Sequence, residues 1–193
     1  MIMKRKQEIE RIAEKIRKCT LCRLWKTRNK VVFGEGPINA KIMLIGQAPG
    51  KQEDKVGKPF VGRAGKLLNK LLRKAGINRD ECFITSVLKC FPPKNRKPKK
   101  QEIRKCKPYL LKQIELIRPK VIVLLGNTAV EAILGKTKLK EVRGKKFFIN
   151  HMLFVPTYHP AAALRFKQLE KEIEKDLSMA KTFYELYSNH KSN

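Results

Sequence analysis

The chain has few acidic residues and no long apolar run. Only 17 Asp and Glu stand against 45 Lys and Arg in 193 residues, which leaves a formal net charge of +28 at pH 7. The longest apolar runs, at 42–45 and 121–125, are far shorter than the roughly 20 residues that span a bilayer. Because the N-terminal segment is charged throughout, it also lacks the apolar stretch of a signal peptide. We therefore exclude a membrane enzyme and expect a cytoplasmic protein.

The excess of positive charge favours a polyanionic partner. Since 42% of the residues are hydrophobic, the chain can build a core, and we expect the charge on the surface of a folded body. A surface rich in Lys and Glu is also typical of thermophilic proteins, in which ion pairs stabilise the fold. Balanced pairs would leave a net charge near zero, so an excess of this size indicates phosphate contacts.

Hydrophobic spacing predicts strands that alternate with helices. The predicted helices span residues 2–19, 64–75, 102–117 with an interruption near Pro108, 127–134 with Asn127 as its cap, and 161–187. The predicted strands span residues 31–33, 41–46, 82–88, 120–126, 142–150 and 152–156. Residues 46–65 and 91–100 are rich in Gly, Pro or basic residues and are expected to be loops. No linker or repeat divides this α/β chain, so we expect a single domain over residues 1–193 with a mostly parallel sheet.

Three of the loops have a position that is typical of a ligand site. In a parallel sheet, the loops that follow the carboxyl ends of the strands form the binding crevice. The sequence GQAPG at 46–50, the segment 86–90 and the sequence TYHP at 157–160 all follow predicted strands. GQAPG lacks the spacing of the nucleotide-binding loops, so its own signal is weak.

Glycines and a histidine strengthen this interpretation. Gly57, Gly62 and Gly65 would let a ligand approach the backbone around Phe60 closely. His159 lies between an apolar strand and a helix start, where a histidine is often structural. In the functional alternative, its imidazole donates a hydrogen bond to a developing oxyanion.

The five cysteines indicate a metal centre. An odd number without an export signal argues against a disulfide framework. Cys19 and Cys22 form a CxxC pair, and 15 residues separate Cys90 from Cys106. These four side chains could bind zinc or a [4Fe–4S] cluster, or be ordinary buried thiols, and the spacing does not decide among these. Cys82 alternates with apolar neighbours and is expected to be an ordinary buried thiol.

Three motifs, together with the four paired cysteines, resemble the family-4 uracil-DNA glycosylases, the iron–sulfur branch of their superfamily. The motifs are GQAPGKQEDKVGKPFVGRAGKLL, ITSVLKCFPPKNRKP and VPTYHPAAALR. The resemblance implies a three-layer α/β/α sandwich around a parallel four-stranded sheet. It also implies a monofunctional glycosylase that hydrolyses deaminated bases, chiefly uracil, from single- and double-stranded DNA. By the same resemblance, a structural [4Fe–4S] cluster that ties the N-terminal helix to residues 91–100 is bound by Cys19, Cys22, Cys90 and Cys106.

The resemblance also assigns roles to the loop residues. Phe60 would stack on the flipped base, and His159 would donate to its O2 as the glycosidic bond lengthens. Gln47 and Glu53 are candidates for orienting the attacking water, although a loop Glu beside lysines is also typical of a solvated ion pair. Ala48 stands where related branches carry an Asp, which excludes a general base at that position. The predicted base pocket consists of Gly46, Gln47, Ala48, Phe60, Ser86 and His159.

Two residues depart from the family pattern. Gln47 replaces a Glu, and Ser86 replaces the Asn of the second motif. A hydroxyl rotates to suit either a donor or an acceptor, so we expect weaker uracil excision or a range broadened to hypoxanthine or xanthine.

The basic residues near the motifs are expected to contact phosphates without reading sequence. These are Arg63, Lys66, Lys94, Arg96 and Arg165. We expect a monomer on DNA. One alternative is a non-catalytic iron–sulfur or zinc module that binds nucleic acid, although such a module would not need Phe60 and His159. A hydrolase of RNA or nucleosides is disfavoured because nothing indicates a pocket that reads a 2′-hydroxyl.

Overall fold

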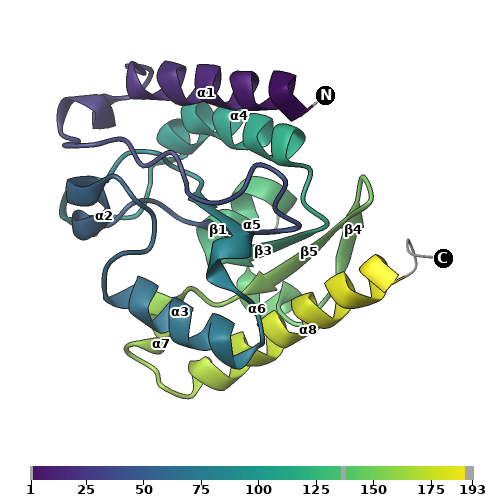
Figure 1. Cartoon of the computed structure of the whole chain (residues 1–193). Coiled ribbons are helices and arrows are strands. Elements are labelled where there is room, and N and C mark those ends of the chain that lie inside the picture. The colour runs from purple at the N-terminus through teal and green to yellow at the C-terminus, as the bar shows by residue number, and fades with distance from the viewer. Residues whose placement is uncertain (1, 136–137, 190–193) are drawn as a thin grey trace.

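A sheet of four parallel strands, extended by one antiparallel strand, forms the middle layer of the molecule (Figure 1). The computed structural model describes residues 2–135 and 138–189. The strand order is β2-β1-β3-β5-β4. The strands are β1 (Ile42–Gly46), β2 (Cys82–Ser86), β3 (Val121–Leu125), β4 (Phe147–Ile149) and β5 (Met152–Thr157). The prediction of a mostly parallel α/β sheet is confirmed, and the antiparallel edge strand β4 is one more than the resemblance implied.

Helices cover both faces of the sheet (Figure 1). One face packs against α1 (Ile2–Arg17), α4 (Lys100–Ile117), α5 (Asn127–Leu134) and α6 (Leu139–Val142). The other face packs against α3 (Arg63–Lys74), α7 (Pro160–Ala163) and α8 (Leu169–Asn189). The remaining helices are α2 (Lys51–Val56) and the 3₁₀ turns η1 (Arg23–Lys26), η2 (Arg79–Glu81) and η3 (Pro93–Asn95). No helix in the described part of the chain is long and apolar enough to cross a membrane.

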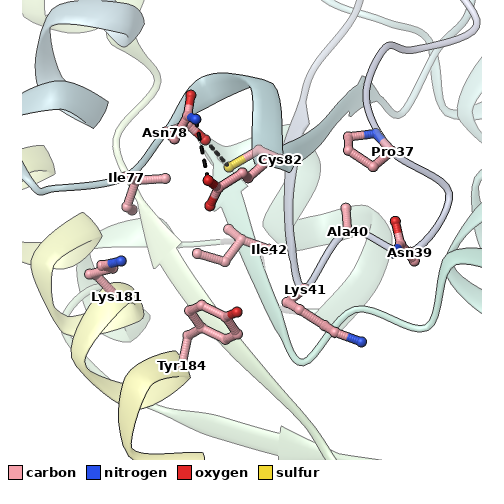
Figure 2. Close-up of a pocket in the computed structure, with 11 residues that line it drawn as sticks. Pro37, Asn39, Ala40, Lys41, Ile42, Ile77, Asn78, Cys82, Lys181 and Tyr184 are labelled. Atoms are coloured by element: carbon pink, nitrogen blue, oxygen red, sulfur yellow. Dashed lines mark hydrogen bonds between the residues drawn. The ribbon is translucent and has the colours of Figure 1, made fainter. Parts of the chain in front are cut away.

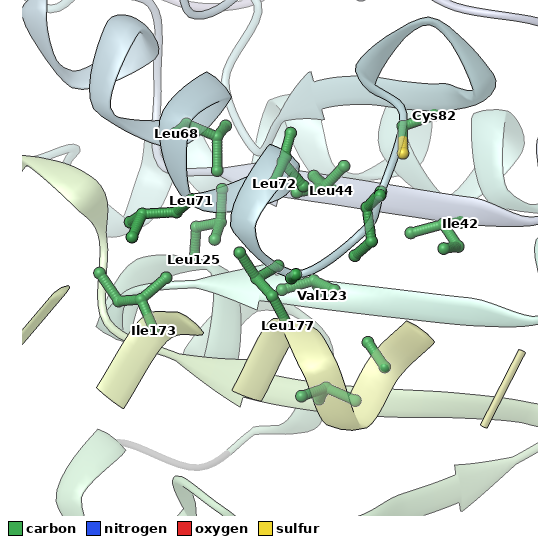
Figure 3. Packing of buried hydrophobic residues seen from close by; sticks show 14 of the residues in the cluster. Ile42, Leu44, Leu68, Leu71, Leu72, Cys82, Val123, Leu125, Ile173 and Leu177 are labelled. Atoms are coloured by element: carbon green, nitrogen blue, oxygen red, sulfur yellow. The ribbon is translucent and has the colours of Figure 1, made fainter. Parts of the chain in front are cut away.

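The alternation of side chains along each strand builds two cores. In β1, Leu44 belongs to the core beneath α3 and α8, whereas Met43 and Ile45 belong to the core beneath α4 and α5. Figure 3 shows the first of these cores, where Leu71 of α3 and Leu177 of α8 lie with Leu44 between the sheet and the two helices. Because both faces of the sheet are buried, the sequences of its inner strands are nearly continuous runs of apolar residues.

Two segments predicted as strands are shorter or absent. Residues 31–33 are irregular, and just after them, among the described residues, Glu35 forms an isolated antiparallel bridge with Ile84 at the free edge of β2. The predicted strand at 142–150 is reduced to β4, because Val142 still belongs to α6. In both segments, β-branched residues raised the strand signal. Val31 instead packs against a small core of Leu24, Leu88 and Cys90, and Val142 packs from α6 into the core beneath α4 and α5.

The helix predictions differ from the structure in four places. Residues 51–56, predicted as loop, form α2 between Gly50 and a left-handed Gly57. Pro108 does not interrupt α4, in which its side chain is exposed to solvent. The predicted helix at 161–187 is two helices, α7 and α8, separated by residues 164–168. Gly126 is the N-cap of α5, because the Asn127 side chain instead accepts a hydrogen bond from the Leu139 N–H at 2.9 Å.

The carboxyl ends of the parallel strands meet at one edge of the sheet. Gly46 at the end of β1 pairs with Ser86 at the end of β2. The Gly126 N–H, after β3, donates to the Thr157 carbonyl at the end of β5 at 2.8 Å. The three loops predicted as a ligand site therefore converge.

Candidate functional site

A cavity of about 70 Å³ opens at this edge of the sheet. Its lining residues are Val32, Ala48, Pro49, Gly50, Glu53, Pro59, Phe60, Ala64, Ser86 and His159. The structure thus brings together five residues predicted from distant parts of the sequence: Ala48, Glu53, Phe60, Ser86 and His159. Val32 was not predicted to lie here, because an apolar residue in an irregular segment carries no chemical signal.

Phe60 is held in a conformation that depends on glycines. Its φ is +53°, which is uncommon for a residue other than glycine, and its ring stacks on His159 with centroids 5.6 Å apart and planes 26° apart. A Cβ on Gly65 would lie 1.7 Å from the Phe60 carbonyl oxygen, and a Cβ on Gly46 would lie 2.8 Å from the Phe60 ring. Gly65 therefore accommodates the Phe60 backbone, and not a ligand as the sequence had suggested.

Replacement of Gly65 with alanine is expected to displace Phe60. The new methyl group cannot coexist with a carbonyl oxygen at 1.7 Å, so the turn that carries the ring must move. We expect the activity that this cavity supports to fall by at least about tenfold, a loss typical of small displacements at a reacting centre. Activity assays, with circular dichroism as a folding control, measure this, and Arg73→Ala, at an exposed position of the same helix, tests whether any change in α3 has the same effect. Unchanged activity of Gly65→Ala would contradict the role of Gly65.

Glu53 holds the same turn from the other side. Its Oε1 accepts hydrogen bonds from the Val61 N–H at 2.9 Å and from the Gly62 N–H at 2.8 Å. Gly62 is the N-cap of α3, so the carboxylate also lies at the positive end of a helix dipole. Glu53 thus stabilises the turn that carries Phe60, and its second carboxylate oxygen, Oε2, remains available for other contacts.

His159 is an N-cap whose bonding indicates its tautomer. Its Nδ1 accepts a hydrogen bond from the Ala161 N–H at 3.1 Å, so the proton of the neutral ring belongs on Nε2. Burial lowers the pKa of His159 to about 4, although the Glu53 carboxylate acts in the opposite direction. The imidazole is therefore neutral near pH 7 and offers one N–H donor.

The hydroxyl of Ser86 is not free to rotate as the sequence suggested. Ser86 is 4% exposed, and its Oγ donates to the Leu88 carbonyl at 2.6 Å. With its proton engaged, the oxygen presents only lone pairs to the cavity. Gln47 is not among the lining residues; its Oε1 accepts a hydrogen bond from the Thr128 hydroxyl at 2.7 Å, which leaves the amide NH₂ as a donor.

A buried lysine lies directly behind Ser86. Lys89 is 1% exposed, and its Nζ donates to Thr85 Oγ1 at 2.6 Å, the Ser86 carbonyl at 2.7 Å and Gln113 Oε1 at 2.6 Å. Burial lowers the pKa of Lys89 to about 7. The sequence gave no sign of this network, because a lysine in so basic a chain is expected on the surface.

The four paired cysteines gather around a second, small cavity of about 20 Å³, which Arg28 and Tyr109 also line. Arg28 Nη1 donates a hydrogen bond to the Cys90 sulfur at 3.4 Å. The Leu24 backbone acts to lower the pKa of Cys22, and the Lys89 ammonium and backbone act to lower that of Cys106, although burial outweighs them. Burial raises the pKa values of Cys22, Cys90 and Cys106, the last to about 12.

The chemistry of this donor set fits an iron–sulfur cluster. Buried thiols ionise when they bind iron, and hydrogen bonds to the sulfurs then stabilise the thiolates. Within residues 2–135 and 138–189, no three His, Cys, Asp or Glu side chains are arranged to hold a metal ion. Cys82 lies apart from this cavity, at the start of β2, and its Sγ donates to the Asn78 carbonyl at 3.4 Å.

Four of the five predicted phosphate contacts are exposed. Arg63, Lys66, Lys94 and Arg165 all have exposed side chains. Arg96 instead pairs with Glu102 through two bonds of 2.9 and 2.5 Å, and Glu102 also accepts the Lys99 N–H at the start of α4. The Arg96 guanidinium is therefore engaged with Glu102 in the first turn of α4.

A larger cavity of about 290 Å³ lies at the opposite end of the sheet, where β1 and β2 begin (Figure 2). Figure 2 shows Ile42, Asn78 and Cys82 beside Lys181 and Tyr184 of α8. None of the predicted site residues lines it. Its size therefore does not make it the candidate site, which is defined by the residues at the carboxyl edge.

Comparison with known proteins finds one family over most of the chain. Residues 33–183 match the profile of the Uracil DNA glycosylase superfamily. The chain is 46% identical over 183 residues to a type-4 uracil-DNA glycosylase of Saccharolobus solfataricus, which covers 90% of this chain and 85% of the relative. It is 46% identical over 178 residues to that of Sulfurisphaera tokodaii, covering 87% and 81%. It is 42% identical over 184 residues to that of Thermotoga maritima, covering 93% and 96%.

Proposed function

Because the chain belongs to the uracil DNA glycosylase superfamily, we propose that the cavity at the carboxyl edge of its sheet is the pocket for a flipped uracil. The protein is a DNA glycosylase that removes uracil from DNA by hydrolysing the N-glycosidic bond, as a step of DNA repair. The observation that carries the assignment of the pocket is the stacked pair of Phe60 and His159 in one cavity.

The pocket supplies an aromatic ring on which a base can stack and an N–H group that can donate a hydrogen bond to the base. A base within a duplex cannot be reached, so the nucleotide flips out at a cost of a few kcal/mol, and stacking on an aromatic ring offsets part of that cost. The Phe60 ring, held by its strained backbone, provides the stacking face. His159 lies against that ring, so its Nε2–H is placed near the edge of the base.

Cleavage depends on where charge develops. As the glycosidic bond breaks, negative charge gathers on the uracil O2, and the neutral His159 donates a hydrogen bond there without transferring its proton. Glu53 supplies the one carboxylate among the residues that line the cavity. Its free oxygen faces the positive charge that builds on the sugar and, together with the Gln47 amide, orients the water that attacks C1′.

Ser86 provides the discrimination between bases. Because its hydroxyl proton is bonded to the Leu88 carbonyl, Oγ accepts the N3–H of uracil and repels the N3 lone pair of cytosine. Hypoxanthine also carries an N–H donor in its ring, so the same oxygen accepts it. We propose a range that includes other deaminated bases besides uracil.

Substitution Ser86→Asn tests this specificity. The amide supplies a donor and an acceptor together, so we expect uracil excision to rise and hypoxanthine excision to fall, each by about tenfold, the scale of one hydrogen bond. Single-turnover rates on duplexes with one uracil or one hypoxanthine measure this, with Ser86→Ala as the variant that lacks the acceptor. No change in either rate with Ser86→Asn would refute the proposal.

We also propose that Cys19, Cys22, Cys90 and Cys106 hold a [4Fe–4S] cluster. When bound, the cluster has a structural role and ties the end of α1 to the segment after β2. The gathering of the four side chains around one small cavity and the hydrogen bond from Arg28 to the Cys90 sulfur support this assignment.

One experiment tests the function against its main alternative. We expect a brown protein, and alkaline cleavage of a duplex that carries one uracil but not of a matched duplex with thymine. A colourless, zinc-containing protein that binds the duplex without creating an alkali-labile site would instead support a non-catalytic module. Binding should act through exposed cations such as Arg63 and Arg165, and should therefore weaken steeply with salt.

A further inference from the structure

Arg28 joins three separate parts of the chain at the cysteine cavity. Its Nη1 donates to the Cys19 carbonyl at 2.8 Å and to the Cys90 sulfur at 3.4 Å. Its Nη2 donates to the Arg17 carbonyl at 2.7 Å, at the C-terminal end of α1. One guanidinium therefore connects the first helix, the CxxC turn and the segment that follows β2.

Arg28 brings a charged donor to a cysteine sulfur. Among the described residues, Arg28 is the one cationic side chain bonded to a cysteine of this set, since the Lys89 ammonium bonds to oxygens instead. A guanidinium keeps its charge at every pH at which the protein is folded.

We propose that Arg28 is a positioning residue that controls both the retention and the reduction potential of the cluster. This inference rests on the cluster assigned above. A fixed positive charge with a hydrogen bond to a cluster sulfur favours the more negative oxidation state, so it raises the reduction potential. The same fork holds Cys19 and Cys90 at a fixed separation, which opposes the opening that precedes the loss of iron.

The role can be measured without an activity assay. We expect Arg28→Gln to lose its visible absorbance at least threefold faster than the wild-type protein under a ferrous chelator with mild oxidant. We also expect a lower midpoint potential when the electrode donates one electron to the cluster. Arg23→Gln is the matched control, because Arg23 is an exposed cation in the same segment. This control should behave like the wild-type protein in both measurements.

The outcomes separate this inference from the cluster assignment. A wild-type protein without iron would refute the cluster itself. A brown wild-type protein whose bleaching rate and potential are unchanged in Arg28→Gln would overturn the role of Arg28. If Arg28→Gln purifies without its cluster, the Arg28→Lys variant provides the test. Lysine retains the positive charge but lacks the planar guanidinium that forms several hydrogen bonds at once. Intermediate bleaching of the lysine variant supports the proposal, and wild-type bleaching overturns it.

Discussion

Replacement of His159 with alanine is expected to lower kcat for uracil excision by at least about 10²-fold, the typical cost of losing one donor to a developing oxyanion. The neutral ring offers a single N–H at Nε2, because Nδ1 already accepts the Ala161 N–H. In the alanine variant, water would have to solvate the charge on O2. We expect KM and the affinity for uncleaved DNA to change little, since the donor acts chiefly as the bond breaks.

The pH dependence of the wild-type enzyme tests the state of this histidine. Burial lowers the pKa of His159 to about 4, so the neutral ring predominates above that pH. Protonation would place an N–H on Nδ1 opposite the Ala161 N–H and break the cap. We therefore expect kcat/KM to be flat from about pH 8 to about pH 5 and to fall as the pH drops through about 4.

Two controls keep this test specific. His159→Gln retains an N–H donor without a titrating ring, so it should lose less activity than alanine and show no acid limb from this residue. The folded pKa lies below the ordinary value near 6.5, so the unfolded state binds more protons between pH 4 and 6.5, and stability should rise with pH across that window. An acid limb centred near pH 6.5 would contradict the buried, neutral histidine.

The sequence was sufficient to predict that three of the loops converge, because their position follows from a general property of parallel sheets. Segments 46–50, 86–90 and 157–160 each follow a strand, and parallel strands end at one edge. Phe60 lies outside these loops; the glycines around it pointed to its backbone, and its stacking role came from the resemblance alone. Its contact with His159 depends on a left-handed turn that only the structure shows.

The parts that could not be predicted depend on contacts between distant segments. Glu53 accepts hydrogen bonds from backbone N–H groups eight and nine residues further along the chain, so no pattern of side chains in the sequence predicts that it stabilises the Phe60 turn. The orientation of the Ser86 hydroxyl depends on the Leu88 carbonyl, which the turn after β2 places within hydrogen-bond distance. Lys89 can be buried because Gln113 of α4 accepts one of the hydrogen bonds of its ammonium group. In a chain with so many basic residues, the composition gives no indication that one lysine is buried. Polar groups that satisfy one another in the interior leave little trace in hydrophobic spacing.

Removal of the proposed cluster is expected to loosen one end of the molecule before the rest. A small core there consists of Leu24, Leu88 and Cys90, with Ala48 and Val31 packed against it. Without the bonds to iron, this core retains few apolar groups to hold the segment between α1 and β1. We expect Cys90→Ala to lose the brown colour and to raise amide hydrogen exchange at 18–33 by at least about 10²-fold, with β3 little affected, because a structural metal site stabilises the fold around it.

This loosening should also reach the base pocket. Ser86 and Cys90 lie only four residues apart, and the Leu88 N–H donates to the Gln47 carbonyl at 3.1 Å. Because Leu88 also accepts the Ser86 hydroxyl, movement at Cys90 shifts the acceptor that reads the base. Uracil excision by Cys90→Ala should fall. Cys82→Ala is the matched control, since that buried thiol lies at the other end of β2 and should alter neither colour nor exchange at 18–33. Equal effects of the two substitutions would show that the sheet carries the loss, and not the cluster.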